Sequence, residues 1–185
     1  MAVAAYAVAD FGFAARPSRP ARLWVPGLRK VPDDVIPVQA KVAATYAHAT
    51  LAKQRARAEG YDDAVFVDGH GNLTESGSMS CFLVVDGVLR VPGLDHVLDG
   101  ITRQAVLELA ADEGIGAEVG PVPAELLDVA QEAFLTSTTR NVWPVGRIGD
   151  WDLPAPGPVT ARLAARLQDV LRGVDPLSQR WLQPL

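Results

Sequence analysis

The chain has 185 residues, of which 49% are hydrophobic and 21% are charged, values typical of a globular protein with one sizeable core. The formal net charge of −5 argues against a general nucleic-acid-binding role, because phosphate backbones attract basic surfaces. We therefore expect a single domain over residues 1–185 and no nucleic-acid partner.

We expect neither a membrane span nor an export signal. The longest apolar stretches are short and interrupted, and residues 1–21 lack a basic segment ahead of their apolar part. The expected location is therefore the cytoplasm. Residues 1–21 are interpreted as an N-terminal extension of uncertain role, whose alternating apolar residues suit a strand. The single cysteine, Cys81, lies in the apolar run CFLVV, which favours a core thiol over a reactive one.

The first predicted elements lead to a helix that contains a lysine. A short strand is expected over 22–25, and the prolines at 26, 32 and 37 favour an extended approach to the helix. Apolar residues then recur near helical spacing over 38–59, and Gly60 suits the end of that helix. The pattern places Lys41 in the opening turn of the helix.

The remaining elements alternate between strands and helices. Short apolar runs separated by Asp-Gly and Gly-Asn pairs predict hairpins between residues 64 and 92. A helix is predicted from near Thr102 to Gly114. Further elements are a strand at 117–123, a helix at 124–132, a buried strand at 133–139, a hairpin-like segment at 142–154 and an amphipathic helix at 158–174. This order favours an α+β domain with a mixed sheet or barrel.

Lys41 and Glu75 together suit pyridoxal phosphate chemistry. A lysine amine forms an imine with the cofactor aldehyde, and a carboxylate beside the pyridine nitrogen keeps that nitrogen protonated. The apolar neighbours of Lys41 are expected to place its amine near buried surface, which favours the neutral nucleophile. Each residue also has a simpler interpretation: Lys41 as a solvated helix lysine, and Glu75 as a turn carboxylate.

Two segments offer donors for a phosphate group. Gly100, Ile101 and Thr102 stand at the predicted start of a helix, where free amides and the helix dipole attract anions. Thr138 and Thr139 end an apolar strand and add hydroxyl and amide donors. The alternatives are a helix cap for the first segment and ordinary strand threonines for the second.

Four motifs occur in the order and approximate spacing seen in class IV aminotransferases. They are AKVAATY with Lys41 and Tyr46, TESGSMS with Glu75, LDGITR at 98–103, and FLTSTTRNVWPV at 134–145. Over roughly residues 24–150, the chain resembles the cofactor-holding domain of this family. The family comprises fold-type IV enzymes and includes branched-chain and D-amino acid aminotransferases and aminodeoxychorismate lyase. We therefore expect a cofactor domain over 22–150.

The resemblance implies pyridoxal 5'-phosphate as cofactor and roles for individual residues. It makes Lys41 the Schiff-base lysine that also moves protons, Glu75 the partner of the pyridinium nitrogen, and Tyr46 the partner of the ring hydroxyl. The phosphate would be bound by Ile101, Thr102, Thr138 and Thr139. Arg140 would reach a substrate carboxylate or form a surface salt bridge, and Trp143 would be a pocket wall or core. His48, His70 and His96 lack ligand spacing, so we assign them no metal role.

The implied activity moves an amino group between an amino acid and a 2-oxo acid, with a lyase reaction as the alternative within enzymes. The chain departs from the family pattern at Ser76 and Ser80, where glycine and asparagine are common. Only forty residues precede Lys41, so we expect the smaller N-terminal domain of the family to be missing. Arg16, Arg19 and Arg22 are the candidates to replace the phosphate-binding arginine of that domain.

The missing domain leaves two interpretations open. A homodimer or a partner chain would complete the cleft. Alternatively, the protein is a truncated, non-catalytic or repurposed homologue that acts by binding a ligand or partner.

Overall fold

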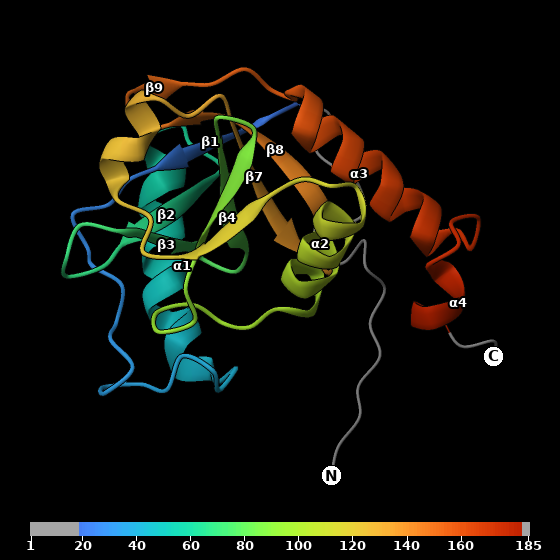
Figure 1. The fold of residues 1–185 in the computed structure, drawn as a ribbon. Helices are drawn as coiled ribbons and strands as arrows, with labels where there is room; N and C mark the ends of the chain where they lie inside the picture. The colour runs from blue at the N-terminus through green and yellow to red at the C-terminus, as the bar shows by residue number, and fades with distance from the viewer. Residues whose placement is uncertain (1–18, 183–185) are drawn as a thin grey trace, which may run out of the picture.

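The computed structural model describes residues 19–182 (Figure 1). The strand expected within the first 21 residues therefore falls almost entirely outside the described residues. The strand predicted at 22–25 is confirmed one residue earlier, as β1 (Ala21–Trp24).

Within residues 19–182, nine strands form one mixed sheet. After β1 come β2 (Asp63–Val67), β3 (Leu73–Ser76), β4 (Ser80–Val85), β5 (Val88–Pro92), β6 (Ala117–Gly120), β7 (Glu132–Ser137), β8 (Asn141–Ile148) and β9 (Trp151–Asp152). Their order is β3-β2-β1-β8-β7-β4-β5-β6, β9 pairs with β8, and β3 also pairs with β4. This last pairing closes six strands into a ring, so the predicted α+β fold with a mixed, barrel-like sheet is confirmed.

In the described part of the chain, three longer helices pack around this sheet: α1 (Ala43–Ala58), α2 (Ile101–Asp112) and α3 (Pro158–Leu171). Figure 1 shows α2 and α3 together on one side of the barrel, with α1 away from both. A short helix, α4 (Ser178–Trp181), comes after α3. Gly60 and Gly114 lie just beyond α1 and α2 with φ of 80° and 70°, so both predicted helix ends are confirmed.

The core has a barrel interior and an outer layer. Interior residues include Leu23, Val65 and Leu135, whereas Phe82 and Phe134 face α2 and α3 and stack with ring centroids 4.7 Å apart. All six residues of β4 are buried, because one face points into the barrel and the other against the helices. Cys81 is among them, and burial raises the pKa of its thiol to about 12, in agreement with the expected core thiol.

The C-terminal helix is held by a buried carboxylate. Glu132, only 3% exposed, accepts hydrogen bonds from the amides of Val159 (2.9 Å) and Thr160 (2.7 Å) in the first turn of α3. Gly157 lies so close that an added Cβ would be 2.1 Å from the Glu132 Cδ atom. The junction between β7 and α3 therefore requires both residues.

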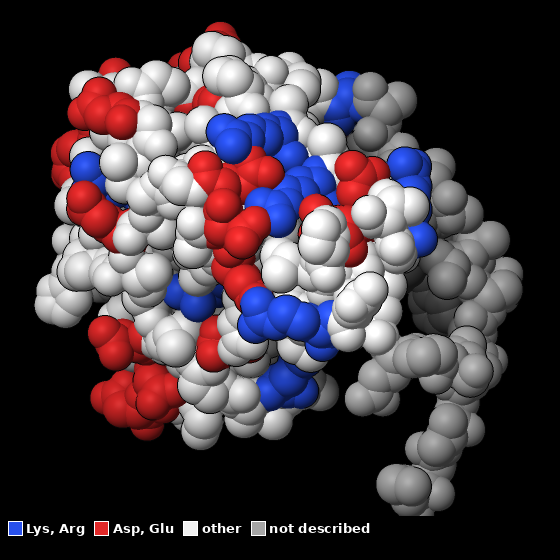
Figure 2. Space-filling view, turned by 45° about the vertical axis from the view of Figure 1, so that its right-hand side comes forward, with Lys and Arg blue, Asp and Glu red and all other residues white. Residues whose placement is uncertain are grey.

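Ion pairs add to this contact at the surface. Arg166 of α3 pairs with Asp112, with Glu113 at 3.2 Å and with Asp175 at 3.0 Å. Figure 2 shows acidic and basic side chains side by side on the face turned forward from the α3 side, with no broad area of one sign.

Two predicted helices have different bounds in the structure. The helix expected from residue 38 begins five residues later, because Asp33 accepts the amide of Val38 (2.7 Å) and turns continue to Val42. The prediction that Lys41 opens the helix was therefore wrong. The helix expected over 124–132 is a short 3-10 helix, η2 (Ala124–Asp128).

None of the helices in the described part of the chain has the length and apolar character needed to span a bilayer. The cytoplasmic location stays a prediction.

Candidate functional site

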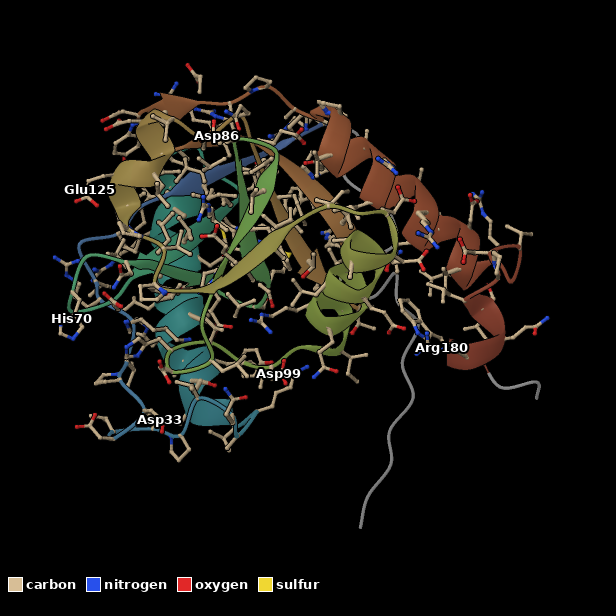
Figure 3. The ribbon with its side chains drawn as sticks, viewed as in Figure 1. Asp33, His70, Asp86, Asp99, Glu125 and Arg180 are labelled. Atoms are coloured by element: carbon tan, nitrogen blue, oxygen red, sulfur yellow. The ribbon has the colours of Figure 1, made fainter. Side chains whose placement is uncertain are left out.

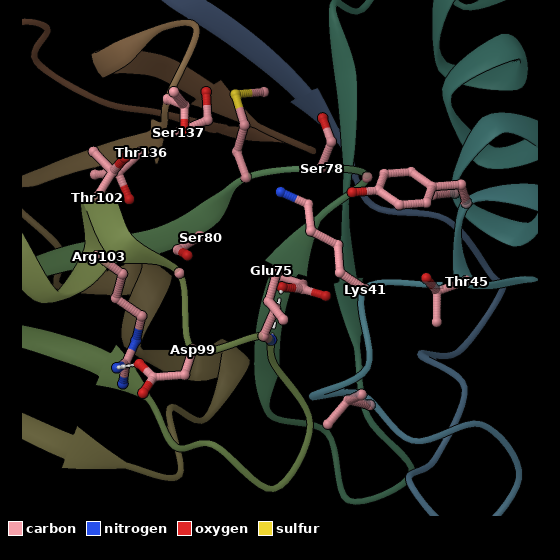
Figure 4. Close-up of a pocket in the computed structure, with 18 of the residues that line it drawn as sticks. Lys41, Thr45, Glu75, Ser78, Ser80, Asp99, Thr102, Arg103, Thr136 and Ser137 are labelled. Atoms are coloured by element: carbon pink, nitrogen blue, oxygen red, sulfur yellow. Dashed lines mark hydrogen bonds and ion pairs between the residues drawn. The ribbon is translucent and has the colours of Figure 1, made fainter. Parts of the chain in front are cut away.

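The largest group of predicted site residues meets in one cavity of about 270 Å³ (Figure 4). It lies where the N-terminal ends of α1 and α2 approach β3, β4 and the end of β7. This volume is just below the range of roughly 300–1,000 Å³ typical of small-ligand sites. Its lining includes Lys30, Lys41, Thr45, Tyr46, His48, Glu75, Ser78, Ser80, Asp99, Ile101, Thr102, Arg103, Thr136, Ser137 and Thr138.

We call the part formed by Lys41, Thr45 and Tyr46 the lysine side of the cavity. Lys41 lies two residues before α1, and Val42 between them is extended, with φ −96° and ψ 154°. This break in the helix lets Lys41 and Tyr46 line the same cavity although they are five residues apart. In Figure 4 the Lys41 side chain extends into the cavity and its amino end lies near Ser78.

The lysine side is more exposed than the sequence predicted. The apolar neighbours Val42, Ala43 and Ala44 are all exposed, and so is Lys41 itself. The prediction that they bury the amine was wrong for the described residues. Among those residues Lys41 has no recorded hydrogen bond or ion pair, which leaves its amine available to a ligand.

Glu75 lies on β3, with its carboxylate in the cavity and 14% of its side chain exposed. One carboxylate oxygen, Oε1, pairs with the Lys30 ammonium group. The other, Oε2, accepts a hydrogen bond from the Leu98 amide at 3.2 Å. Both oxygens are thus held, and the carboxylate has a fixed orientation.

We call the part formed by Gly100, Thr102, Thr136 and Ser137 the donor side of the cavity. Gly100 is the N-cap of α2, and no side chain caps this helix, so its first amides remain available. Figure 4 shows Thr102, Thr136 and Ser137 gathered together. Thr136 is 2% exposed, and its hydroxyl has no hydrogen-bond partner within the described part of the chain.

Arg103 adds a buried positive charge behind the donor side. It is 4% exposed, donates to the Pro92 carbonyl (3.1 Å) and to Asp99 (3.3 Å), and its Nε lacks a partner among residues 19–182. Burial lowers the pKa of the guanidinium, and the Asp99 carboxylate opposes that shift. Unpartnered donors, free helix amides and a buried cation together suit an anion such as a phosphate group.

Several predicted residues do not line the cavity. Thr139 is exposed, with its hydroxyl 3.4 Å from that of Ser137. The Arg140 guanidinium lies 5.4 Å from the ring centroid of Trp143. Trp143 is 8% exposed and belongs to the core, with its indole N–H donating to the Arg19 carbonyl (3.1 Å).

The arginines proposed as phosphate partners also lie elsewhere. Arg19 pairs with Asp62 at 2.7 Å, and Arg22 donates to the Gly60 carbonyl at 3.2 Å. Neither lines the cavity, so these two predictions were wrong, and Arg16 is outside the described residues.

Sequence reasoning missed some residues that line the cavity. Lys30 lies outside the four motifs, whereas Ser78, Thr136 and Ser137 lie inside two of them but were given no role. His48 had been considered only as a metal ligand. It lies with its ring centroid 4.8 Å from that of Phe66, and burial, followed by the charge of Lys30, lowers the pKa of its imidazole.

The histidines do not gather into a metal site in the described residues. No group of three or more His, Cys, Asp and Glu side chains there is arranged to hold a metal ion. Figure 3 shows His70 at the outer edge of the molecule, and His96 lies 3.8 Å from Asp68, away from the cavity.

Comparison with known proteins identifies the family of this chain. Residues 4–148 match the amino-transferase class IV family. The chain therefore belongs to that family.

Two relatives are probable branched-chain-amino-acid aminotransferases. The one from Synechocystis sp. is 34% identical over 151 residues, covering 81% of this chain and 50% of the relative. The one from Aquifex aeolicus is 33% identical over 175 residues, covering 91% of this chain and 55% of the relative. The chain spans about half the length of these curated relatives.

Solved structures confirm the fold. The branched-chain aminotransferase from the archaeon Thermoproteus uzoniensis, with norvaline, has a TM-score of 0.84 and 32% identity, over 89% of this chain and 56% of that chain. The PLP-form of the branched-chain amino acid aminotransferase from Thermobaculum terrenum has a TM-score of 0.86 and 29% identity, over 90% of this chain and 55% of that chain. The expected fold of fold-type IV aminotransferases is thus confirmed.

Proposed function

We propose that this chain is the cofactor-holding part of a pyridoxal-phosphate-dependent aminotransferase, which moves an amino group between an amino acid and a 2-oxo acid. The observation that carries the proposal is the convergence of the four motifs. Lys41, Tyr46, Glu75, Thr102 and Thr138 come from separate segments of the sequence and line one cavity. The names of the relatives and the PLP-form of a similar enzyme support the same chemistry.

The residues present fit the proposed cofactor at both ends. The donor side offers amides and hydroxyls for the phosphate, including the amides of Ile101 and Thr102 at the start of α2, and Thr138 lines the same cavity. At the other end, the Glu75 carboxylate suits a protonated ring nitrogen. When bound, pyridoxal phosphate supplies an aldehyde that condenses with amines and a ring that draws electrons from the substrate's α carbon.

Lys41 and Tyr46, both on the lysine side, have separate tasks in this proposal. The Lys41 amine binds the cofactor and afterwards holds and moves a proton at the substrate's α carbon. Tyr46 accepts or donates a hydrogen bond at the ring hydroxyl and so orients the ring. Exposure of this side leaves water access that a closed site would prevent.

We infer that another polypeptide covers the cavity, either a second copy of this chain or a separate partner. Ile101 is 83% exposed, Val42 40% and Tyr46 37%, and all three are apolar or aromatic side chains in or beside the cavity lining. Such a group of exposed apolar residues favours association. Sedimentation over a range of concentrations tests this: a homodimer or a complex with a copurifying chain is expected, and a monomer at all concentrations counts against it.

Absorbance spectroscopy tests the cofactor proposal. Adding pyridoxal phosphate to the purified protein should produce the visible band of a lysine-bound cofactor. The variant Lys41→Arg, which keeps the charge but cannot bind the aldehyde, should lose the band. Lys53→Arg is the matched control, because Lys53 pairs with Asp63 at 3.1 Å and does not line the cavity. An unchanged band in Lys41→Arg would contradict the assignment of Lys41 as the cofactor-binding lysine.

The same experiment distinguishes the alternative function. A folded protein that shows no spectral change with pyridoxal phosphate, and no exchange of amino groups with 2-oxo acids, would be a homologue that acts by binding. Amino-group exchange would separate an aminotransferase from a lyase, because the lyase eliminates a carbon fragment from its substrate and passes no amino group to a 2-oxo acid.

A further inference from the structure

Lys30 forms an ion pair with Glu75 inside the cavity, and no sequence motif pointed to it. The Lys30 side chain is 12% exposed and that of Glu75 is 14% exposed, so the pair is largely shielded from water. Both residues line the cavity. A charged hydrogen bond in such surroundings is stronger and better oriented than one at the surface.

The fold fixes the position of Lys30. Its backbone amide donates to the Val67 carbonyl at 3.0 Å, and Arg29 forms an isolated β-bridge with the same residue. Arg29 also donates from its guanidinium to the Asp68 carbonyl at 3.1 Å. The segment is thereby attached to the end of β2, the neighbour of β3, and the ammonium group is held beside Glu75.

The ion pair fixes the orientation of the carboxylate and places a positive charge beside it. Lys30 holds Oε1 while the Leu98 amide holds Oε2, so neither oxygen can turn away without losing a partner. The other charged or titratable groups lining the cavity are Lys41, Tyr46 and His48 near α1, and Asp99 and Arg103 near α2. Within residues 19–182, Lys30 is the only one with a recorded ion pair to Glu75.

We propose that Lys30 is a positioning residue for the reaction: it fixes the Glu75 carboxylate and offsets its charge, and thereby weakens the hold on the proton of the cofactor's ring nitrogen. The inference rests on the proposed function, in which Glu75 faces that nitrogen. A lone carboxylate attracts the ring proton strongly, whereas a carboxylate neutralised by an adjacent ammonium attracts it less. Removing the ammonium charge should therefore raise the pKa of the cofactor's ring nitrogen by about one unit, which is about a tenfold increase in its affinity for the proton.

The first measurement uses the protein without cofactor. The chain contains only three lysines, at 30, 41 and 53, so nitrogen NMR of their ammonium groups gives an assignable spectrum. We expect a Lys30 signal protected from hydrogen exchange, and loss of that protection in Glu75→Gln. A Lys30 signal that exchanges as fast as that of Lys41 would overturn the inference.

The second measurement follows the ring nitrogen itself. Pyridoxal phosphate labelled with nitrogen-15 at the ring is bound to the wild type and to Lys30→Met, and its chemical shift is recorded from neutral to alkaline pH. In Lys30→Met the nitrogen should keep its proton to higher pH, and Lys30→Arg should restore the behaviour of the wild type. Lys53→Met is the control, because it breaks the pair with buried Asp63 without removing a cavity residue.

The outcomes separate this inference from the proposed function. If the wild type binds no labelled cofactor, both fail. If the wild type binds it and Lys30→Met gives the same titration of the ring nitrogen, only the role of Lys30 fails. If Lys30→Met does not fold, the polar but uncharged variant Lys30→Gln replaces it: a ring nitrogen that keeps its proton to higher pH than in the wild type supports the inference, and a titration like that of the wild type overturns it.

Discussion

The two sides of the cavity differ in how firmly the chain holds them. The donor side is built on β7 and the start of α2, beside a core in which Phe82 and Phe134 are fully buried. The lysine side is built on a turn and the first residues of α1, where Val42 and Tyr46 remain exposed. This difference indicates that the core holds the donor side in place, whereas the lysine side is packed less tightly within the described residues.

The largest expected effect on stability is in the core beside the donor side. Phe134→Ala should lower the free energy of unfolding by about 3–5 kcal/mol, because it leaves a cavity beside Phe82 in the layer under α2 and α3. Chemical denaturation measures the loss. Leu51→Ala, on α1 with 44% of the side chain exposed, is the control and should change stability by less than about 1 kcal/mol. Equal losses of unfolding free energy in the two variants would contradict the difference between the two sides.

A smaller effect is expected at the junction of β7 and α3. Gly157→Ala should destabilise the protein by about 1–3 kcal/mol, because its Cβ would overlap the Glu132 carboxyl group that caps α3. Gly120→Ala is the matched control, since a Cβ there meets nothing within 4 Å. If both variants unfold at the same denaturant concentration, the close contact at Gly157 does not hold in solution.

Lowering the pH should destabilise the turn that contains Asp68, at the end of β2. Burial raises the pKa of Asp68, but hydrogen bonds from Asn72 and His70 outweigh it and hold the pKa below its usual value. The lowered pKa contributes stability above the unfolded value of about 3.9, and this contribution is lost as the pH falls. Asp68→Asn should show a smaller loss of stability on acidification than the wild type. An identical acid profile in the two proteins would contradict this prediction.

Chemical labelling gives the simplest comparison of the two sides. At neutral pH the buried Cys81 thiol should react with an alkylating reagent only after unfolding, because its pKa is raised to about 12 and it is 2% exposed. An amine reagent should modify the exposed Lys41 before the shielded Lys30. Mass spectrometry of the peptides reports both rates, and faster modification of Lys30 would reverse the proposed contrast.

The sequence predicted the elements whose signals are local. The Asp86-Gly87 pair predicted the hairpin between β4 and β5, where both residues have positive φ, and Gly60 and Gly114 predicted two helix ends. These residues act through their own backbone conformation, so neighbouring residues are sufficient to identify them.

Two of the wrong or missing predictions depend on contacts between distant residues, and a third depends on a local turn. The pair between Lys30 and Glu75 joins residues 45 apart, and no periodicity reports such a contact. Arg19 was considered for a phosphate role, yet Asp62, 43 residues away, binds it. The start of α1 was placed too early because apolar spacing continues back to residue 38, whereas Asp33 holds the backbone in turns. Tertiary contacts determined the first two results, and a local turn determined the third.

The most direct test of the account is to locate the cofactor among the three lysines. The protein is incubated with pyridoxal phosphate, reduced with borohydride, digested and mapped by mass spectrometry. We expect the pyridoxyl group on Lys41, which is exposed and lines the cavity without a recorded partner in the described part of the chain. A group on Lys30 or Lys53, or none on the folded protein, would contradict the proposed site.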